Sequence, residues 1–352
     1  MQIIEIPKNL LTNKILVDQY DFSSHTNFLY KNDSYLYFKS IKNKLLDKEL
    51  LLNKIDKCVF SPYTNLTSIY KEKYNFTIYD LELIEVLTGV GWFNANVIFN
   101  YLFICNFSSS TFFKSKYYFE RRNKTDIIEN ADLSLFNLKN LFSNLTFIKK
   151  EIINLFNLDI SFLPISKKRN LLLFNLIQYI SIYSANGGWF ILKMKEISND
   201  TFLQEFIYLL SGWYSNCYLV KSSFVFNQEP NLFFICKNFK LSLKIKHNLI
   251  EQFQNLNNIC IEEGEFKWNK LLADPLSKVF VNSIKEVKVI NGQISLTYDD
   301  LIIYILKNKN KEEKINLYLD NNKVKCNFWE QTYIKINEIV DDINENSFVS
   351  MI

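Results

Sequence analysis

Asn186-Gly187-Gly188-Trp189-Phe190-Ile191-Leu192-Lys193 is the segment that most constrains the fold. Two adjacent glycines predict a tight turn that ends one element, and the apolar run after them predicts a buried strand. Side chains alternate between the two faces of a strand, so Lys193 would share a face with Ile191 and oppose Leu192. A buried lysine is costly unless it meets a carboxylate or a ligand. Lys193 is therefore predicted to be either an ion-paired structural residue or a catalytic one.

The composition is that of a globular chain with a mild positive charge. Of the 352 residues, 48% are hydrophobic, which is ample for a core, and the formal net charge of +4 permits a nucleic-acid partner without requiring one. The Asn-, Lys- and Ile-rich bias is typical of an AT-rich genome, cellular or viral. Six scattered cysteines without a C-x-x-C pair indicate a reducing compartment and argue against a zinc site. With no signal-peptide pattern and no long apolar run, we expect a cytoplasmic protein, located in the host cytoplasm or the virion if the chain is viral.

Strands and helices alternate along the middle of the chain. The pattern predicts strands at 83–87, 101–105, 145–148, 152–159, 189–194, 217–220 and 232–236, and helices at 92–101, 170–184 and 201–211. Such alternation predicts an α/β fold with a mostly parallel, doubly wound sheet. The last two strands are too close together for a full crossover helix, so they could form an antiparallel pair at one edge.

The chain is predicted to have three parts. Residues 1–75 form an N-terminal helical extension, residues 76–240 form the α/β domain, and residues 241–352 form a C-terminal α+β appendage. The appendage is predicted to contain hairpins at 287–297 and 315–328, whose turns would be Asn291-Gly292 and Asp320-Asn321-Asn322.

Four features with chemical potential follow one another along the chain. The first, Ile84-Glu85-Val86-Leu87-Thr88-Gly89-Val90-Gly91-Trp92-Phe93, predicts a strand, a glycine turn and a helix, an arrangement that lets the backbone approach a ligand closely. The second is Asp159, at the carboxyl end of an apolar strand, where open α/β sheets place functional residues. The third is Lys193, and the fourth is Glu229, just before the last strand.

These segments resemble the FtsJ-like family of RNA ribose 2′-O-methyltransferases, most closely its eukaryotic and viral mRNA cap-1 branch. Gly187–Lys193 is similar to the family's G-G-x-F-x-x-K strand, and 229–240 is similar to its closing E-x-Y-x-V-C-x-G-F-K strand. Residues 89–94 resemble the G-P-G-G-F-S cofactor loop, although Val90 and Trp92 replace its proline and a glycine. The resemblance covers about residues 35–240. It implies a Rossmann-like methyltransferase sheet with helices on both faces and an antiparallel last strand.

The resemblance also implies a Lys-Asp-Lys-Glu catalytic tetrad. Its members would be Lys44, Asp159, Lys193 and Glu229, with Lys39, Lys42 and Lys48 as alternatives to Lys44. The chemistry is reasonable on its own terms, because a ribose hydroxyl is a weak nucleophile that must be oriented for in-line attack. A partly buried lysine can orient the hydroxyl and accept its proton, while carboxylates position the lysine.

Cofactor and RNA contacts follow from the same resemblance. S-adenosyl-L-methionine would be bound by Gly89, Gly91, Trp92, Phe93 and Asp132, although Asp132 could instead be an ordinary helix N-cap. RNA phosphates would meet Arg121, Arg122, Lys167, Lys168 and Arg169, although such charge runs are usually solvated.

The implied substrate is capped mRNA or another RNA, with subunits of a capping or transcription machinery as further partners and no membrane. Because Val90 and Trp92 depart from the cofactor-loop pattern, an alternative stays open. In that alternative the chain is a catalytically inactive, methyltransferase-fold subunit that binds RNA or acts as a scaffold.

Overall fold

The described parts of the chain fall into two compact units. The computed structural model describes residues 1–8, 64–93, 101–105, 112–114, 118, 126–129, 153–195, 197, 200–223, 231–242, 245–249, 271–272, 274–290, 304 and 312–335. The first unit comprises Met1–Gln19, Asn94–Ser222 and Pro230–Lys288, and the second comprises Tyr20–Phe93, Ser223–Glu229 and Val289–Ile352. Each unit therefore combines distant segments, and the unit boundaries differ from the predicted ones near residues 75 and 240.

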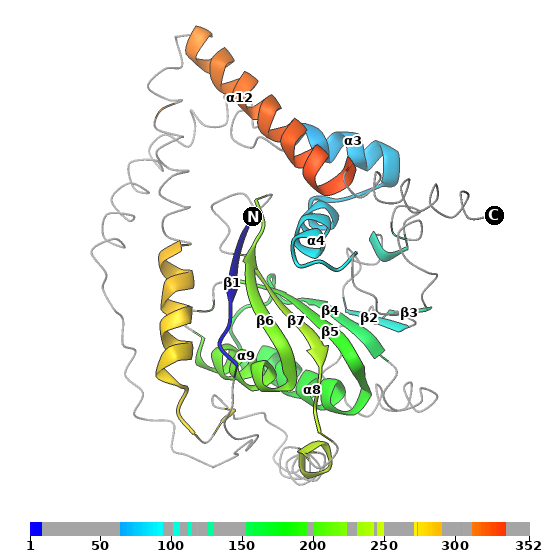
Figure 1. Ribbon diagram of the computed structural model, residues 1–352, viewed down its shortest axis with the longest axis vertical. Coiled ribbons are helices and arrows are strands. Elements are labelled where there is room, and N and C mark those ends of the chain that lie inside the picture. Colours follow the sequence, from blue (N-terminus) through cyan, green and yellow to red (C-terminus); the bar gives the residue numbers. More distant parts are fainter. Residues whose placement is uncertain are drawn as a thin grey trace, which may run out of the picture. The chain divides into compact units, whose positions relative to one another are not determined.

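The first unit contains a seven-stranded sheet (Figure 1). Its strand order is β1-β6-β7-β5-β4-β2-β3. The strands are β1 (Gln2–Glu5), β2 (Tyr101–Cys105), β3 (Asp126–Glu129), β4 (Ile153–Asp159), β5 (Ser184–Met194), β6 (Tyr214–Lys221) and β7 (Leu232–Phe239). Neighbours among β3, β2, β4 and β5 pair in parallel, whereas β7 is antiparallel to both β5 and β6. The predicted α/β sheet with an antiparallel last strand is confirmed. The sheet is not mostly parallel, however, because three of its six strand pairs are antiparallel.

The N-terminus contributes a strand that the sequence did not predict. β1 pairs antiparallel with β6 and is the outermost strand on that side. Within the predicted helical extension, residues 2–5 are therefore a strand. Four residues are too few for their own pattern to reveal this, because the strand exists only through its hydrogen bonds to β6. The pair β6 and β7 is antiparallel as expected, and β1 covers its outer edge.

Helices α8 (Lys167–Tyr183) and α9 (Thr201–Trp213) lie on the same face of this sheet (Figure 1). Alternate side chains of the strands face them and form a single hydrophobic core. Phe190 of β5, for example, has its ring centroid 6.0 Å from that of Phe206 on α9 and 6.1 Å from that of Phe234 on β7. The connections between β2, β3 and β4 lie outside the described residues.

The double glycine lies inside β5 rather than before it. Between the pairs Ile153↔Ser184 and Leu155↔Trp189, one residue of β4 is opposed by 185–188 of β5, so the strand bulges. Gly187 has φ +77, a conformation that favours glycine, and a Cβ on Gly188 would lie 2.8 Å from the Ala185 carbonyl oxygen. The glycines were correctly read as a special backbone site. The prediction that they end an element was wrong, because the ladder resumes beyond them.

The second unit is helical in its described part. It contains α3 (Thr64–Tyr74), α4 (Ile78–Gly89), α12 (Glu312–Glu330) and a short π-helical turn, η3 (Gln331–Lys335). The hydroxyl of Tyr70 on α3 donates to Oε1 of Glu330 at 2.9 Å, which ties α3 to the end of α12. In the part of the chain that the structure describes, no helix has the length and hydropathy to cross a bilayer.

Predicted elements at 83–87 and 315–328 are wrong, and so is the first arm of the hairpin predicted at 287–297, because residues 278–290 are helical. Residues 83–87 belong to helix α4, which starts with a capping box: Thr77 accepts from the Asp80 N–H, and Asp80 accepts from the Thr77 N–H at 2.7 Å. A short apolar run cannot be assigned to a strand or a helix by periodicity alone. Residues 315–328 form helix α12 instead of a hairpin, since buried Cys326 and Trp329 anchor a helix that runs through the Asp-Asn-Asn segment.

Candidate functional site

The order of the parallel strands defines one edge of the sheet as the place for a ligand. The chain passes from β2 to its neighbour β3 and then returns to β4 on the opposite side of β2. Open α/β sheets bind ligands outside the carboxyl ends of the strands at such a reversal. Here these ends are Cys105 of β2 and Asp159 of β4, flanked by Glu129 of β3 and Met194 of β5.

Asp159 ends β4 at this edge and is held there by the turn that follows. Its Oδ1 accepts both the Ser161 N–H, at 2.8 Å, and the Ser161 hydroxyl, at 2.6 Å. The next backbone N–H, that of Ile160, donates to the Lys193 carbonyl oxygen at 2.8 Å and so extends the ladder between β4 and β5. The carboxylate is 8% exposed, and its orientation is set by a turn rather than by a flexible loop.

Lys193 lies beside Asp159 on the neighbouring strand. The two residues are register partners in the parallel pair of β4 and β5, so their side chains emerge on the same face. This is the face opposite α8 and α9, because Leu192 belongs to the core cluster beneath those helices. Lys193 is 8% exposed, and its Nζ lies 5.6 Å from the centroid of the Phe233 ring on β7.

The structure thus brings together two of the four predicted tetrad residues. Among the described residues Asp159 accepts hydrogen bonds only from Ser161, so the two side chains are neighbours without being a closed ion pair. Lys44 and Glu229 lie outside the described residues, and their roles stay predictions. A carboxylate beside an ammonium group, both largely buried at a ligand-binding edge, can orient a hydroxyl group and move its proton.

A second lysine lies on the same face but away from this edge. Lys237 of β7 has its Nζ 5.0 Å from the Trp189 ring centroid and 5.2 Å from that of Tyr218. Burial lowers the pKa of Lys237. Trp189 precedes Lys193 by four residues, so the two lysines are separated by about 13 Å along β5. Lys237 therefore provides a matched comparison for Lys193.

The glycine segment predicted to bind a cofactor is the end of helix α4. The Trp92 N–H donates to the Leu87 carbonyl at 2.8 Å and the Gly91 N–H donates to that of Thr88 at 3.0 Å, which is the Schellman pattern. Gly91 has φ +76, as the residue after the cap of a helix usually requires. Trp92 is fully buried. The predicted strand is thus wrong here, and Gly89 and Gly91 follow a helix instead; most of the helix predicted at 92–101 lies outside the described residues.

The structure does not test the cofactor contacts that were predicted for this segment. The roles of Gly89, Gly91, Trp92 and Phe93 stay predictions. All four residues belong to the second compact unit, whereas the sheet belongs to the first. Asp132 lies outside the described residues.

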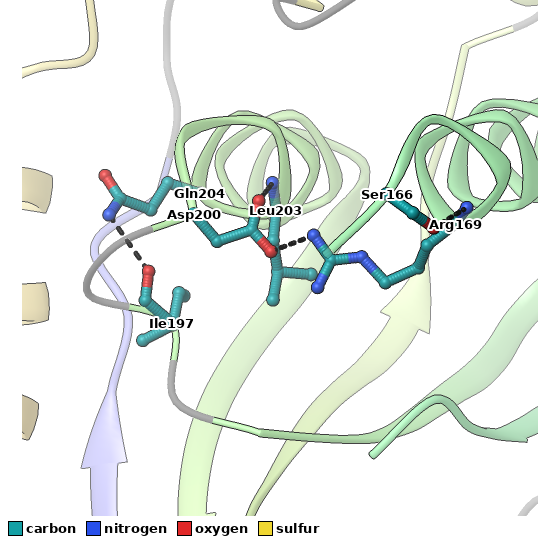
Figure 2. Close-up of polar contacts among 6 residues, drawn as sticks. All are labelled: Ser166, Arg169, Ile197, Asp200, Leu203 and Gln204. Atoms are coloured by element: carbon teal, nitrogen blue, oxygen red, sulfur yellow. Dashed lines mark hydrogen bonds and ion pairs between the residues drawn. The ribbon is translucent and has the colours of Figure 1, made fainter. Parts of the chain in front are cut away.

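Arg169 was predicted to contact RNA, and the structure gives its guanidinium a protein partner. Its Nη2 forms an ion pair with Oδ2 of Asp200 (Figure 2). The two side chains are 6% and 3% exposed. Asp200 also caps α9, because its Oδ1 accepts the Leu203 N–H at 3.1 Å, and Arg169 itself follows the α8 cap, Ser166. The pair therefore joins the first turns of α8 and α9.

The side chains of the other four predicted RNA contacts lie outside the described part of the structure. Lys167 and Lys168 are the first residues of α8, and only their backbone is described. Arg121 and Arg122 lie outside the described residues. The RNA contacts of all five basic residues, including Arg169, stay predictions.

Two residues at the carboxyl edge were not singled out from the sequence. Glu129 ends β3, next to the strand reversal. Asn157 lies on the same face as Asp159, two residues earlier on β4, and is fully buried. A single amide inside the apolar run Leu155-Phe156-Asn157-Leu158 was the available signal. This signal is weak because the Asn-rich composition makes any one asparagine uninformative.

Comparisons with known proteins add little to this geometry. No family model and no curated protein matches the chain. Among solved structures, the chain is similar to one from Plasmodium falciparum described as a ribosomal RNA methyltransferase, with 15% identity and a TM-score of 0.31. That match covers 46% of this chain and 96% of the other. The description belongs to that protein, and at this similarity it bears on neither the activity nor the site of this chain.

Proposed function

We propose that this protein is an S-adenosylmethionine-dependent RNA ribose 2′-O-methyltransferase that acts on the cap-adjacent nucleotide of mRNA. The observation that carries the proposal is the pairing of Asp159 and Lys193 on one face, at the carboxyl ends of two adjacent parallel strands. These are the two tetrad positions that the structure describes. A register shift of one residue between β4 and β5 would have placed the two side chains on opposite faces.

Glu129 is at the position in the sheet where the proposed cofactor would need an acidic residue. Nucleotide-binding sheets place an acidic residue after their second strand to bind ribose hydroxyls, and Glu129 ends the parallel strand next to the reversal. When bound, S-adenosylmethionine supplies a methyl group activated by its sulfonium. The remaining work falls to the side chains of this chain, which must bind RNA, exclude water and hold the attacking hydroxyl.

Lys193 is the residue whose position best suits it to orient that hydroxyl group and accept its proton. In its neutral form its Nζ accepts the proton of the ribose 2′-hydroxyl as the oxygen becomes the nucleophile. Asp159, fixed by Ser161, faces the ammonium group that results and stabilises its charge. Both groups are largely withdrawn from water, which strengthens their electrostatic interaction with a bound substrate.

Binding and methyl transfer test the proposal separately. Titration calorimetry of the full chain with S-adenosylmethionine should show binding, and Lys193→Met should keep it. Transfer of labelled methyl groups to capped RNA should fall by about 10²–10⁴-fold in Lys193→Met. Lys237→Met is the matched control, because it removes a lysine from the same face about 13 Å away, and it should keep both properties.

The RNA substrate identifies the acceptor atom and the RNA class. Capped RNA whose first nucleotide carries a 2′-O-methyl or 2′-deoxy ribose should accept no methyl group. Uncapped ribosomal and transfer RNA should be poor substrates, and efficient transfer to either would overturn the cap assignment. A wild-type protein that binds RNA but not S-adenosylmethionine would overturn the enzymatic proposal and favour a non-catalytic scaffolding subunit.

A further inference from the structure

The buried face of β4 contains an amide group without a hydrogen-bond partner. Asn157 is 0% exposed, and neither its Nδ2 nor its Oδ1 is hydrogen-bonded in the described structure. Folded proteins pair nearly all buried polar groups, so an unpaired amide usually indicates a water or ligand that completes it. A leucine has the same branching and would avoid the desolvation cost. The asparagine therefore lowers the stability of the ligand-free protein.

Asn157 lies where the sheet is expected to bind a ligand. It pairs with Ile104 of β2 on one side and with Ile191 of β5 on the other. β2 ends one residue beyond Ile104, so Asn157 is one residue pair below the carboxyl edge at the strand reversal. Because side chains alternate along a strand, Asn157 shares its face with Asp159 and with Lys193.

We propose that the amide of Asn157 binds the amino-acid end of S-adenosylmethionine. The inference rests on the function proposed above. The methyl group must lie near Lys193 and Asp159, and the amino-acid end is a short chain attached to the same sulfonium. An asparagine amide offers both a donor and an acceptor. These match a carboxylate and an ammonium group, which the zwitterionic end of the cofactor carries side by side.

The test compares stability without ligand and affinity for two ligands in full-length Asn157→Leu. S-adenosylhomocysteine keeps the amino-acid end, whereas 5′-methylthioadenosine lacks it. The Tm of the ligand-free variant should rise by about 2–4 °C, because an unpaired buried amide is removed. Its Kd for S-adenosylhomocysteine should increase about 10- to 100-fold, as expected for lost hydrogen bonds to charged groups. Its Kd for 5′-methylthioadenosine should not change.

Two further variants make the result interpretable. Asn157→Ala removes the amide without adding volume, and it should lose the same affinity even if leucine does not fit. Ser215→Ala removes a buried hydroxyl, also without a partner in the described structure, from the start of β6 at the opposite end of the sheet. Its affinity for S-adenosylhomocysteine should equal that of the wild type.

The two proposals fail in different ways. If the wild type does not bind S-adenosylhomocysteine, the proposed function fails and this inference with it. If the wild type binds and both Asn157 variants bind equally well, only the inference fails. Equal weakening for both ligands would also overturn it, because the amide would then act on the adenosine half.

Discussion

Substitution of Asp200 by serine isolates the charge of the buried ion pair between α8 and α9. The two oxygens of Asp200 have separate tasks: Oδ1 caps α9 through the Leu203 N–H, and Oδ2 binds Arg169 (Figure 2). Serine can still cap the helix, so Asp200→Ser removes mainly the ion pair. It leaves a guanidinium that is only 6% exposed without its counter-charge.

The expected cost is large because the remaining charge cannot reach water. Breaking a buried ion pair by removing one partner typically costs about 3–5 kcal/mol. Arg169→Met should cost a similar amount, since it leaves the carboxylate of Asp200 buried and unpaired. Asp200→Ala should cost about 1 kcal/mol more than Asp200→Ser, because the α9 cap is lost as well. The double variant Arg169→Met/Asp200→Ser leaves no unpaired charge and should be far more stable than the sum of the single variants predicts.

Hydrogen exchange of the α8 and α9 amides is the suitable assay. The chain has two compact units, so a single unfolding transition cannot be assumed, whereas exchange reports local opening. At about 1.4 kcal/mol per factor of ten, the single variants should lose about 10²–10⁴-fold in protection.

The double-mutant cycle decides the outcome. A coupling energy below about 1 kcal/mol would show that the two side chains do not interact in solution, and the reasoning would be refuted. If Arg169→Met also weakened RNA binding while leaving protection of α8 and α9 unchanged, Arg169 would be a phosphate contact, as its sequence context predicts.

Three further outcomes follow from the structure. Thr77→Ala removes one half of the α4 capping box and should destabilise α4 by about 1 kcal/mol, measured by hydrogen exchange of its amides. Gly187→Ala should cost about 1–2 kcal/mol, measured by hydrogen exchange of the β5 amides, because φ is +77 there, and Gly187→Asn should cost less. Burial raises the pKa values of Tyr179 and Tyr214 above the ordinary 10.0. Their contribution to stability should therefore be lost as pH rises above about 10. In difference spectra between the wild type and Tyr179→Phe/Tyr214→Phe, the tyrosinate absorbance of these two residues should appear only as the first unit unfolds; their absorbance in the folded protein would contradict this.

Most elements of the sheet could be predicted because their signals are local. Alternating apolar residues and bracketing polar residues identified β4, β5 and the two helices α8 and α9. The prediction of a strand at 83–87, which is part of helix α4, was wrong because the local signal there is ambiguous. These five residues suit a buried strand or a buried helix equally well, and the capping box at Thr77 and the Schellman end at Gly91 were the signals that should have decided it.

Some residues of the candidate site could likewise be identified from the sequence, and others could not. Asp159 and Lys193 were identifiable because each is a charged residue next to an apolar strand. Asn157 was not, because the chemistry of a single asparagine depends on whether its surroundings satisfy it. Burial and the absence of a hydrogen-bond partner are properties of the packed sheet.

The sequence by itself determined the α/β alternation, the antiparallel last strand, the special backbone at Gly187 and Gly188, and the two charged strand ends. Only the tertiary structure decided that Asp159 and Lys193 are register partners on one face, because pairing between strands far apart in sequence depends on long-range hydrogen bonds. It also decided that Arg169 forms an ion pair with Asp200 and that β1 pairs with β6 as an additional strand of the sheet. Local patterns set what each segment can form, whereas its partners are chosen when the whole chain buries its apolar surface.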